Sequence, residues 1–294
     1  MRNLPQPNRS TDRATLTTAL SQYQYKGVAK GYAGTAEEVT AVLAVYDAYD
    51  AARGVANIAL TTPEMDAALK QALHDAYDQT QKRRRLKHVR EELFSGVELC
   101  PVCGIDPPTE LDHVLPRSAY KAVAVYVRNL VPLCHLCNHH KLAGFAEPGE
   151  LPFLHAYFDQ LPDIQFLHAE VRLQDSTLSV TFSIDGLDAV ADSLGDKLKN
   201  IHIRLNLSER YLAEVNIFLA SQAISLHGAY AAGGSQGVKA QLRAQAQYEI
   251  RRFYRNHWRP TLLAKLSTCD DFCNGGFIPV FNVPAEILRD AFGS

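Results

Sequence analysis

Two stretches of the first hundred residues repeat apolar side chains at helical spacing. The first follows Thr35, which forms a capping-box pattern with Glu38. Its apolar positions are Val39, Val42, Leu43, Tyr46 and Tyr49. The second follows Thr62-Pro63, a pair that suits the cap and first position of a helix, and its stripe can extend toward Phe94. We predict a helical region over residues 1–95, with residues 1–34 as a mostly irregular lead-in.

The pattern changes to a period of two after residue 165. Apolar and polar residues alternate over 166–173 and again over 178–184, which predicts a β-hairpin. Helical spacing returns from about Ser208 to His227, and Gly228 is expected to end that helix. Residues 231–237 have the composition of a flexible linker, and another helix is expected at about 238–257. These patterns together predict an α+β fold that is mostly helical.

Composition and charge restrict the class of protein. Apolar residues make up 47% of the 294 positions, which is typical of a globular chain and not of a disordered one. Thirty Lys and Arg against 32 Asp and Glu give a net charge of −2, so a uniformly basic nucleic-acid coat is excluded. Neither a membrane-spanning run nor the apolar part of a signal peptide is present, and we expect a cytoplasmic protein.

Four of the six cysteines form two Cys-x-x-Cys pairs, separated by the thirty residues 104–133. The pairs are Cys100 with Cys103 and Cys134 with Cys137. Because each pair can chelate from one tight turn, the two pairs predict a tetrahedral structural zinc site. The other interpretation is that all four are buried free thiols, which we also expect for Cys269 and Cys273.

Further polar residues stand at fixed places around the cysteines. Asp112-His113 ends a short apolar segment and is followed by Pro116, Asn129 begins another such segment, and Asn138 follows the last cysteine directly. This arrangement resembles the HNH endonuclease family, whose ββα-metal finger has a strand, a loop, a second strand and a helix. The resemblance covers about residues 100–141 and departs from the family's name in one respect, since Asn138 stands at the last H position.

The residue types suit metal-dependent hydrolysis of phosphodiester bonds. His113 titrates near neutral pH and is the expected general base for water. Asp112 and Asn138 offer oxygen ligands to a catalytic Mg²⁺ or Mn²⁺, with His139 or His140 as alternatives. The resemblance implies that Asn129 orients the His113 ring.

Basic residues near this segment are candidate contacts for the phosphates of DNA. They are Lys141, Arg117, Lys121 and the run Lys82, Arg83, Arg84, Arg85, Lys87 and Arg90. A solvated protein surface is the ordinary interpretation of such a run. For the arginines and aromatic residues of 243–259, a phosphate-binding surface and a buried core are equally compatible with the sequence.

Changes in residue composition and pattern along the chain suggest three parts. They are an N-terminal helical region at 1–95, a nuclease finger at 96–145 and an α+β region at 146–294. The flanks resemble, more weakly, the HNH subunit of Septu-type bacterial anti-phage defence systems, which implies an ABC-type ATPase partner. The rival function is a non-catalytic zinc-knuckle module that binds nucleic acid or protein. Such a module has no need for Asp112-His113, Asn129 and Asn138 at these positions.

Overall fold

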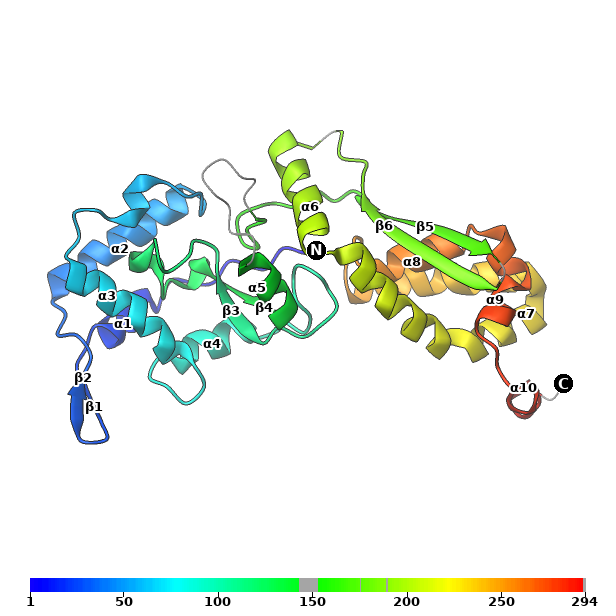
Figure 1. Cartoon of the computed structure of the whole chain (residues 1–294), viewed down its shortest axis with the longest axis horizontal. Helices are drawn as coiled ribbons and strands as arrows, with labels where there is room; N and C mark the ends of the chain where they lie inside the picture. The colour runs from blue at the N-terminus through cyan, green and yellow to red at the C-terminus, as the bar shows by residue number, and fades with distance from the viewer. Residues whose placement is uncertain (143–152, 175, 189, 293–294) are drawn as a thin grey trace.

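The structure is a computed structural model that describes residues 1–142, 153–174, 176–188 and 190–292. The chain is α+β and mostly helical, as predicted, and it forms an elongated molecule (Figure 1). The N-terminal helices are α1 (Asp12–Ala19), α2 (Ala36–Ala51), α3 (Ala67–Ala76) and α4 (Lys87–Phe94). Those after them are α5 (His135–Leu142), α6 (Asp192–Arg204), α7 (Leu207–Arg252), α8 (Trp258–Leu266), α9 (Phe277–Val280) and α10 (Ala285–Phe292). In the described part of the chain, no helix is long and apolar enough to cross a membrane.

Three antiparallel strand pairs accompany these helices. They are β1 (Tyr23–Tyr25) with β2 (Val28–Lys30), β3 (Glu110–His113) with β4 (Leu130–Leu133), and β5 (Leu167–Gln174) with β6 (Thr177–Ile184). The predicted hairpin is therefore confirmed as β5–β6, whose alternate side chains Leu178, Val180 and Phe182 are buried. It packs against α7 and α8 in the C-terminal half of the molecule (Figure 1).

The first predicted helix is confirmed, and the second begins later than expected. The Thr35 hydroxyl accepts from the Glu38 amide at 3.2 Å, and the Glu38 carboxylate accepts from the Thr35 amide at 2.8 Å. Thr62, in contrast, ends the short 3-10 helix Ile58–Thr61 with a left-handed backbone at φ 48° and does not cap α3. The Asp66 carboxylate caps α3 instead.

One further expectation for the N-terminal region is wrong. The apolar stripe does not continue as one helix to Phe94, because the chain turns between α3 and α4, with Arg83 at φ 65°. The lead-in of residues 1–34 is mostly irregular as predicted, but it also contains α1 and the β1–β2 hairpin. Their short lengths leave too few apolar positions for periodicity to reveal them.

The break predicted at 231–237 is confirmed in part, because α7 consists of two helical segments that meet at a kink there. Gly233 and Gly234 have non-helical backbone angles. The first segment continues past Gly228, which does not end it as expected. The second segment runs back along the first, since the backbones of Ala229 and Gly237 approach closely and Glu214 and Arg252 line one cavity.

The small β3–β4 sheet lies between two hydrophobic clusters. Leu111 and Leu130 pack into the cluster formed by α1–α4, whereas Val131 and Leu133 pack into the cluster of β5, β6, α7 and α8. Met1 and Leu4 also join the second cluster. The boundary expected at 145/146 lies outside the described residues. The sheet is thus held from both sides, which fixes the residues at its ends.

Candidate functional site

The four predicted cysteines come together. The Sγ atoms of Cys100, Cys103, Cys134 and Cys137 all lie within 4.8 Å of one another, and all four residues are buried. Backbone amides point at the sulfurs, with Ile105 N donating to Cys103 Sγ at 3.4 Å. Four converging thiol groups on two tight turns fit the donor set of structural zinc. In the described part of the chain, these cysteines are the only group of three or more potential His, Cys, Asp or Glu ligands.

An arginine that the sequence did not indicate closes this cluster. Arg210 on α7 approaches Cys137 Sγ at 3.5 Å and Cys134 Sγ at 3.9 Å, and it also lies 3.7 Å from Asp106. Four thiolates around one Zn²⁺ leave two negative charges, which a nearby guanidinium partly balances. Since Arg210 is more than seventy residues from Cys137, only the tertiary structure identifies it.

His113, at the end of β3, lines a cavity of about 270 Å³ together with Asp112, Arg117 and Lys141. Its Nε2 lies 2.9 Å from the carbonyl oxygen of Ala124, which can only accept, so Nε2 carries the proton and Nδ1 keeps a lone pair. The Tyr77 ring packs against the imidazole, with the ring centroids 4.4 Å apart. Burial lowers the pKa of His113 to about 3, so the ring is neutral at physiological pH.

Asn129 does not contact the His113 ring as expected. Its Oδ1 accepts from the Leu115 amide at 2.8 Å and from the Tyr49 hydroxyl at 3.1 Å, and its Nδ2 donates to the carbonyls of Leu115 and Val123. These bonds tie both ends of the loop that precedes Ala124, whose carbonyl meets His113. Asn129 therefore acts on the ring through the loop backbone, and Tyr49 is a supporting residue that sequence reasoning missed.

The two predicted metal ligands are not brought together. Asp112 forms an ion pair with Lys141, whose ammonium also donates to the His113 carbonyl at 2.6 Å. Asn138 lies one turn earlier on α5, outside the residues that line the cavity, and donates its amide to Glu110. Burial raises the pKa of Asp112, which Lys141 opposes. Lys141 is buried against Asp112 and also lines the cavity, so its expected contact with phosphate stays a prediction.

The other predicted phosphate contacts differ in whether their charged groups are exposed or already paired within the protein. Arg117 lines the cavity, although its guanidinium also contacts Asp78 at 3.1 Å and lies over the Tyr77 ring. Arg83 and Arg84 are exposed, whereas Arg85 turns inward and donates to the carbonyl of Thr18 at 2.7 Å. The run expected from the sequence is thus divided between surface and structural roles. Of the other candidates, Lys82 is exposed, Lys87 pairs with Glu91, Arg90 donates to the carbonyl of Thr109, and Lys121 donates to Gln71.

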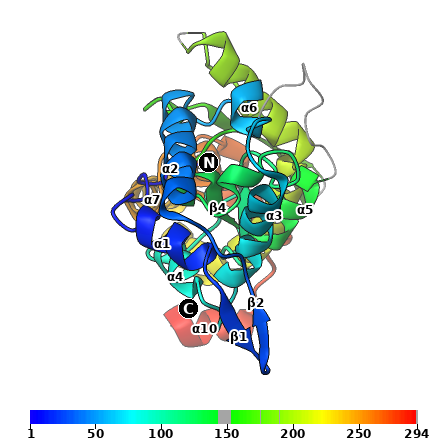
Figure 2. The same ribbon diagram turned by 90° about the vertical axis from the view of Figure 1, so that its left-hand side faces the viewer.

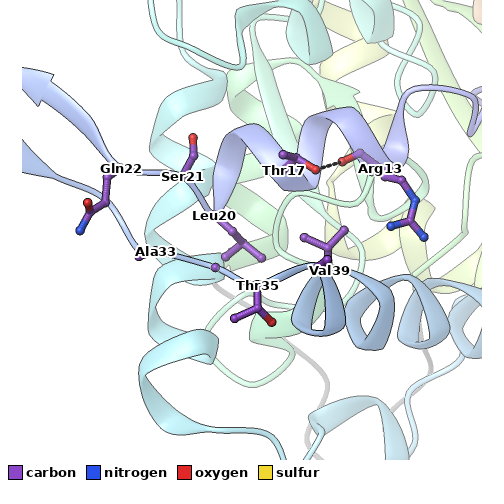
Figure 3. A pocket seen from close by; sticks show the side chains of 10 residues that line it. Arg13, Thr17, Leu20, Ser21, Gln22, Ala33, Thr35 and Val39 are labelled. Carbon is purple, nitrogen blue, oxygen red and sulfur yellow. Dashed lines mark hydrogen bonds between the residues drawn. The ribbon is translucent and has the colours of Figure 1, made fainter.

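A larger cavity of about 420 Å³ lies beside α1 and the start of α2 (Figure 3). Arg13 is the only charged residue in its wall, and the Thr35–Glu38 capping box already satisfies the amides at the start of α2. Because no acid, histidine or cysteine lines it, this cavity lacks the groups for acid–base or metal chemistry. The smaller cavity at His113 carries such groups together with the residues of the HNH-like pattern, and we take it as the candidate active site.

The chain was compared with protein-family models, curated proteins and solved structures, and none of the three comparisons found a match.

The Asp112–Lys141 ion pair predicts a large effect on stability. We expect Lys141→Met to lower the free energy of unfolding by about 3 kcal/mol at pH 8 in EDTA, because it leaves a buried carboxylate unpaired. Chemical denaturation measures this loss. The exposed pair of Lys87 with Glu91 supplies the matched control, since Lys87→Met should change stability by less than about 0.5 kcal/mol. Equal effects of the two substitutions would contradict the assigned pairing.

Two buried histidines predict acid sensitivity. Burial lowers the pKa values of His155 and His257 to about 3, from an ordinary value of 6.5. The unfolded chain therefore binds protons below pH 6.5 that the folded chain does not, and stability falls as pH decreases from 6.5 toward 3. The slope should be about 3 kcal/mol per pH unit for the pair.

Denaturation midpoints measured between pH 7.5 and 4.5 test this slope. His113, whose pKa is also about 3, adds a similar contribution to the measured slope. The substitution His155→Gln should lower the slope by about 1.4 kcal/mol per pH unit, and His139→Gln, at an exposed position, should leave it unchanged. A stability that is flat across this range would show that these rings are protonated in the folded protein.

Proposed function

We propose that this protein is a metal-dependent endonuclease of the HNH type that hydrolyses phosphodiester bonds of DNA. The observation that carries the proposal is the state of His113, which presents a neutral ring with a free Nδ1 to a cavity that Asp112 and Arg117 also line. The order of the elements supports the proposal. The strand β3, which ends at His113, is followed by a loop, the strand β4 and the helix α5, beside the cysteine cluster. The resemblance of residues 100–141 to the HNH pattern supplies the reaction class.

His113 acts in this proposal as the general base. The Ala124 carbonyl holds Nε2–H, so the Nδ1 lone pair is the atom that takes a proton from an attacking water. Burial disfavours the imidazolium, and the ring is therefore unprotonated before the water binds. The Tyr77 ring on one side and the loop tied by Asn129 on the other limit how far the imidazole can rotate.

Asp112 would hold the catalytic Mg²⁺ or Mn²⁺, because it supplies a hard carboxylate oxygen in the wall of the same cavity. Mg²⁺ often takes only one or two protein ligands, so Asp112 fits without a second one. Asn138 donates its Nδ2 to Glu110 and keeps its Oδ1 available, but it does not line the cavity. When bound, such an ion would neutralise phosphate charge and stabilise the departing alkoxide. Arg117 lines the same cavity and would contact a phosphate oxygen there.

A plasmid-cleavage assay tests the proposal. Supercoiled DNA incubated with the protein should be nicked or cut in Mg²⁺ or Mn²⁺, and it should stay intact when neither ion is added or when EDTA is present. Cleavage that is unaffected by EDTA would contradict the metal-dependent mechanism. No cleavage in any divalent metal would instead favour the zinc-knuckle binding module. The expected ABC-type ATPase partner and a role in anti-phage defence stay predictions, tested by repeating the assay with that ATPase.

A further inference from the structure

The β1–β2 hairpin extends away from the helical body in both views of the chain (Figures 1 and 2). Lys26 and Gly27 form its two-residue turn, and their positive φ values of 52° and 76° are those that a type I′ turn requires. Tyr25, which precedes the turn, leaves 42% of its surface exposed. An aromatic ring is thus presented at the tip of a projecting element.

Three cations surround that ring. Lys30 Nζ lies 5.2 Å from the Tyr25 ring centroid, Lys26 Nζ lies 5.7 Å from it, and the guanidinium carbon of Arg84 lies 5.9 Å from it. Arg84 comes from the turn before α4, so residues distant in sequence meet at this ring. Arg83 next to it is exposed and has a left-handed backbone, at φ 65°.

Arg85 fastens this turn to the base of the hairpin. Its guanidinium lies 4.3 Å from the Tyr23 ring centroid and donates to the Ser21 hydroxyl at 2.6 Å. Gln79 donates to the Tyr23 hydroxyl at 3.2 Å from the same side. The hairpin and the basic turn are therefore held together as one surface, and we name residues 21–31 and 79–90 the hairpin patch.

The hairpin patch has a strong local charge on a slightly acidic chain. It contains eight of the thirty Lys and Arg residues and none of the 32 Asp and Glu residues. Lys87 alone among them forms an ion pair with a carboxylate, that of Glu91 on α4. Since the whole chain has a net charge of −2, positive charge is concentrated here and not spread over the molecule.

We propose that the hairpin patch binds single-stranded nucleic acid, with phosphates on Lys26, Lys30, Arg83 and Arg84 and an unpaired base stacked on Tyr25. Exposed aromatic rings among cations are the combination that binds single strands, because every base offers a face for stacking. The proposal deepens the proposed function, since it rests on a nucleic-acid substrate and names the surface that holds it. An acidic protein segment would form ion pairs with the basic side chains, but it has no base to stack on the Tyr25 ring.

Fluorescence anisotropy with a labelled twenty-nucleotide oligothymidine tests this surface in EDTA, where no metal-dependent cleavage occurs. Tyr25→Ala should weaken binding at least about fivefold, because base stacking on an aromatic ring is lost, and Tyr25→Phe should retain it. The double substitution Arg83→Gln and Arg84→Gln should reduce the slope of log affinity against log salt by about 1.4. Phe292→Ala removes an aromatic ring outside the patch that is as exposed as that of Tyr25, at 42%, and should have no effect.

The proposal is overturned if Tyr25→Ala binds the oligonucleotide as tightly as the unmodified chain does. Tighter binding to duplex DNA than to the single strand, or equal binding to polyglutamate, also overturns it. Loss of binding in Tyr25→Ala together with absent plasmid cleavage would uphold the surface and reject the nuclease. Plasmid cleavage together with unimpaired binding by Tyr25→Ala would uphold the nuclease and reject the hairpin patch as the binding surface. The two proposals can therefore be rejected independently.

Discussion

Replacing His113 by alanine is expected to reduce plasmid cleavage by at least about a hundredfold while zinc content and fold are retained. A positioned general base typically contributes between about a hundredfold and ten-thousandfold to the rate. Among the described residues, His74 is the only other histidine in the wall of this cavity. The imidazole makes only one hydrogen bond, to the Ala124 carbonyl, so its removal should cost little stability. Cleavage rates, zinc analysis and thermal denaturation of the same preparations measure these three quantities.

His139→Ala provides the matched control for this substitution. His139 lies on the exposed side of α5 and makes ring contacts only, with His135 and His140. We expect it to cleave at the unmodified rate, which would also remove it as an alternative metal ligand. If His113→Ala cleaves as fast as the control, the catalytic assignment is wrong.

The pH dependence of kcat/KM tests the protonation state of the same ring. This ratio reports the ionisations of the free enzyme, in which His113 has a pKa of about 3. The basic, unprotonated form is present above that value, so activity should not fall between pH 7 and 5.5 because of His113. An acid limb near pH 6.5 that disappears in His113→Ala would contradict the burial argument.

Replacing Cys137 by serine is expected to remove the structural zinc and to lower the stability of the protein by several kcal/mol. The binding of structural zinc is coupled to folding, with apparent free energies of about 10–16 kcal/mol in small zinc domains. Here the cluster joins the turn at 100–103 to the start of α5, and it lies within the hydrophobic cluster that contains α7 and α8. Losing one ligand therefore weakens contacts well beyond the finger.

Zinc analysis and the midpoint of thermal unfolding measure this effect. Cys269→Ser is the appropriate control, because Cys269 is only half-buried and lies outside the four-cysteine cluster. It should keep one zinc ion per chain and shift the midpoint little. An unchanged zinc content in Cys137→Ser would remove the structural-zinc proposal, whatever happens to activity.

The two substitutions also separate the roles of the two metals. His113→Ala should lose cleavage and keep zinc, whereas Cys137→Ser should lose zinc first and cleavage as a consequence of the damaged fold. Soft thiolates and hard carboxylate oxygens prefer different ions, so Mg²⁺ should not restore Cys137→Ser. A rescue of that variant by Mg²⁺ would mean that the cysteines do not hold the finger together.

The sequence predicted those features that depend on short-range spacing. Paired cysteines three residues apart lie on one turn, so the cluster follows once the two turns meet. The Thr35–Glu38 box and the alternation over 167–184 are likewise local, because backbone geometry alone fixes which neighbours can touch. Even so, a plausible cap at Thr62 was wrong, since a left-handed backbone there overrides the side chain's preference.

The tertiary structure decided which partners these residues meet. The sequence by itself predicted that the chain is α+β, that four cysteines form a cluster suited to a metal, and that Asp112 stands next to His113. Only packing brought Lys141 to Asp112, placed Asn129 on the loop and not on the ring, and set Arg210 beside the sulfurs. Burial makes the difference, because a buried polar group must find a partner, and that partner comes from whichever element packs against it.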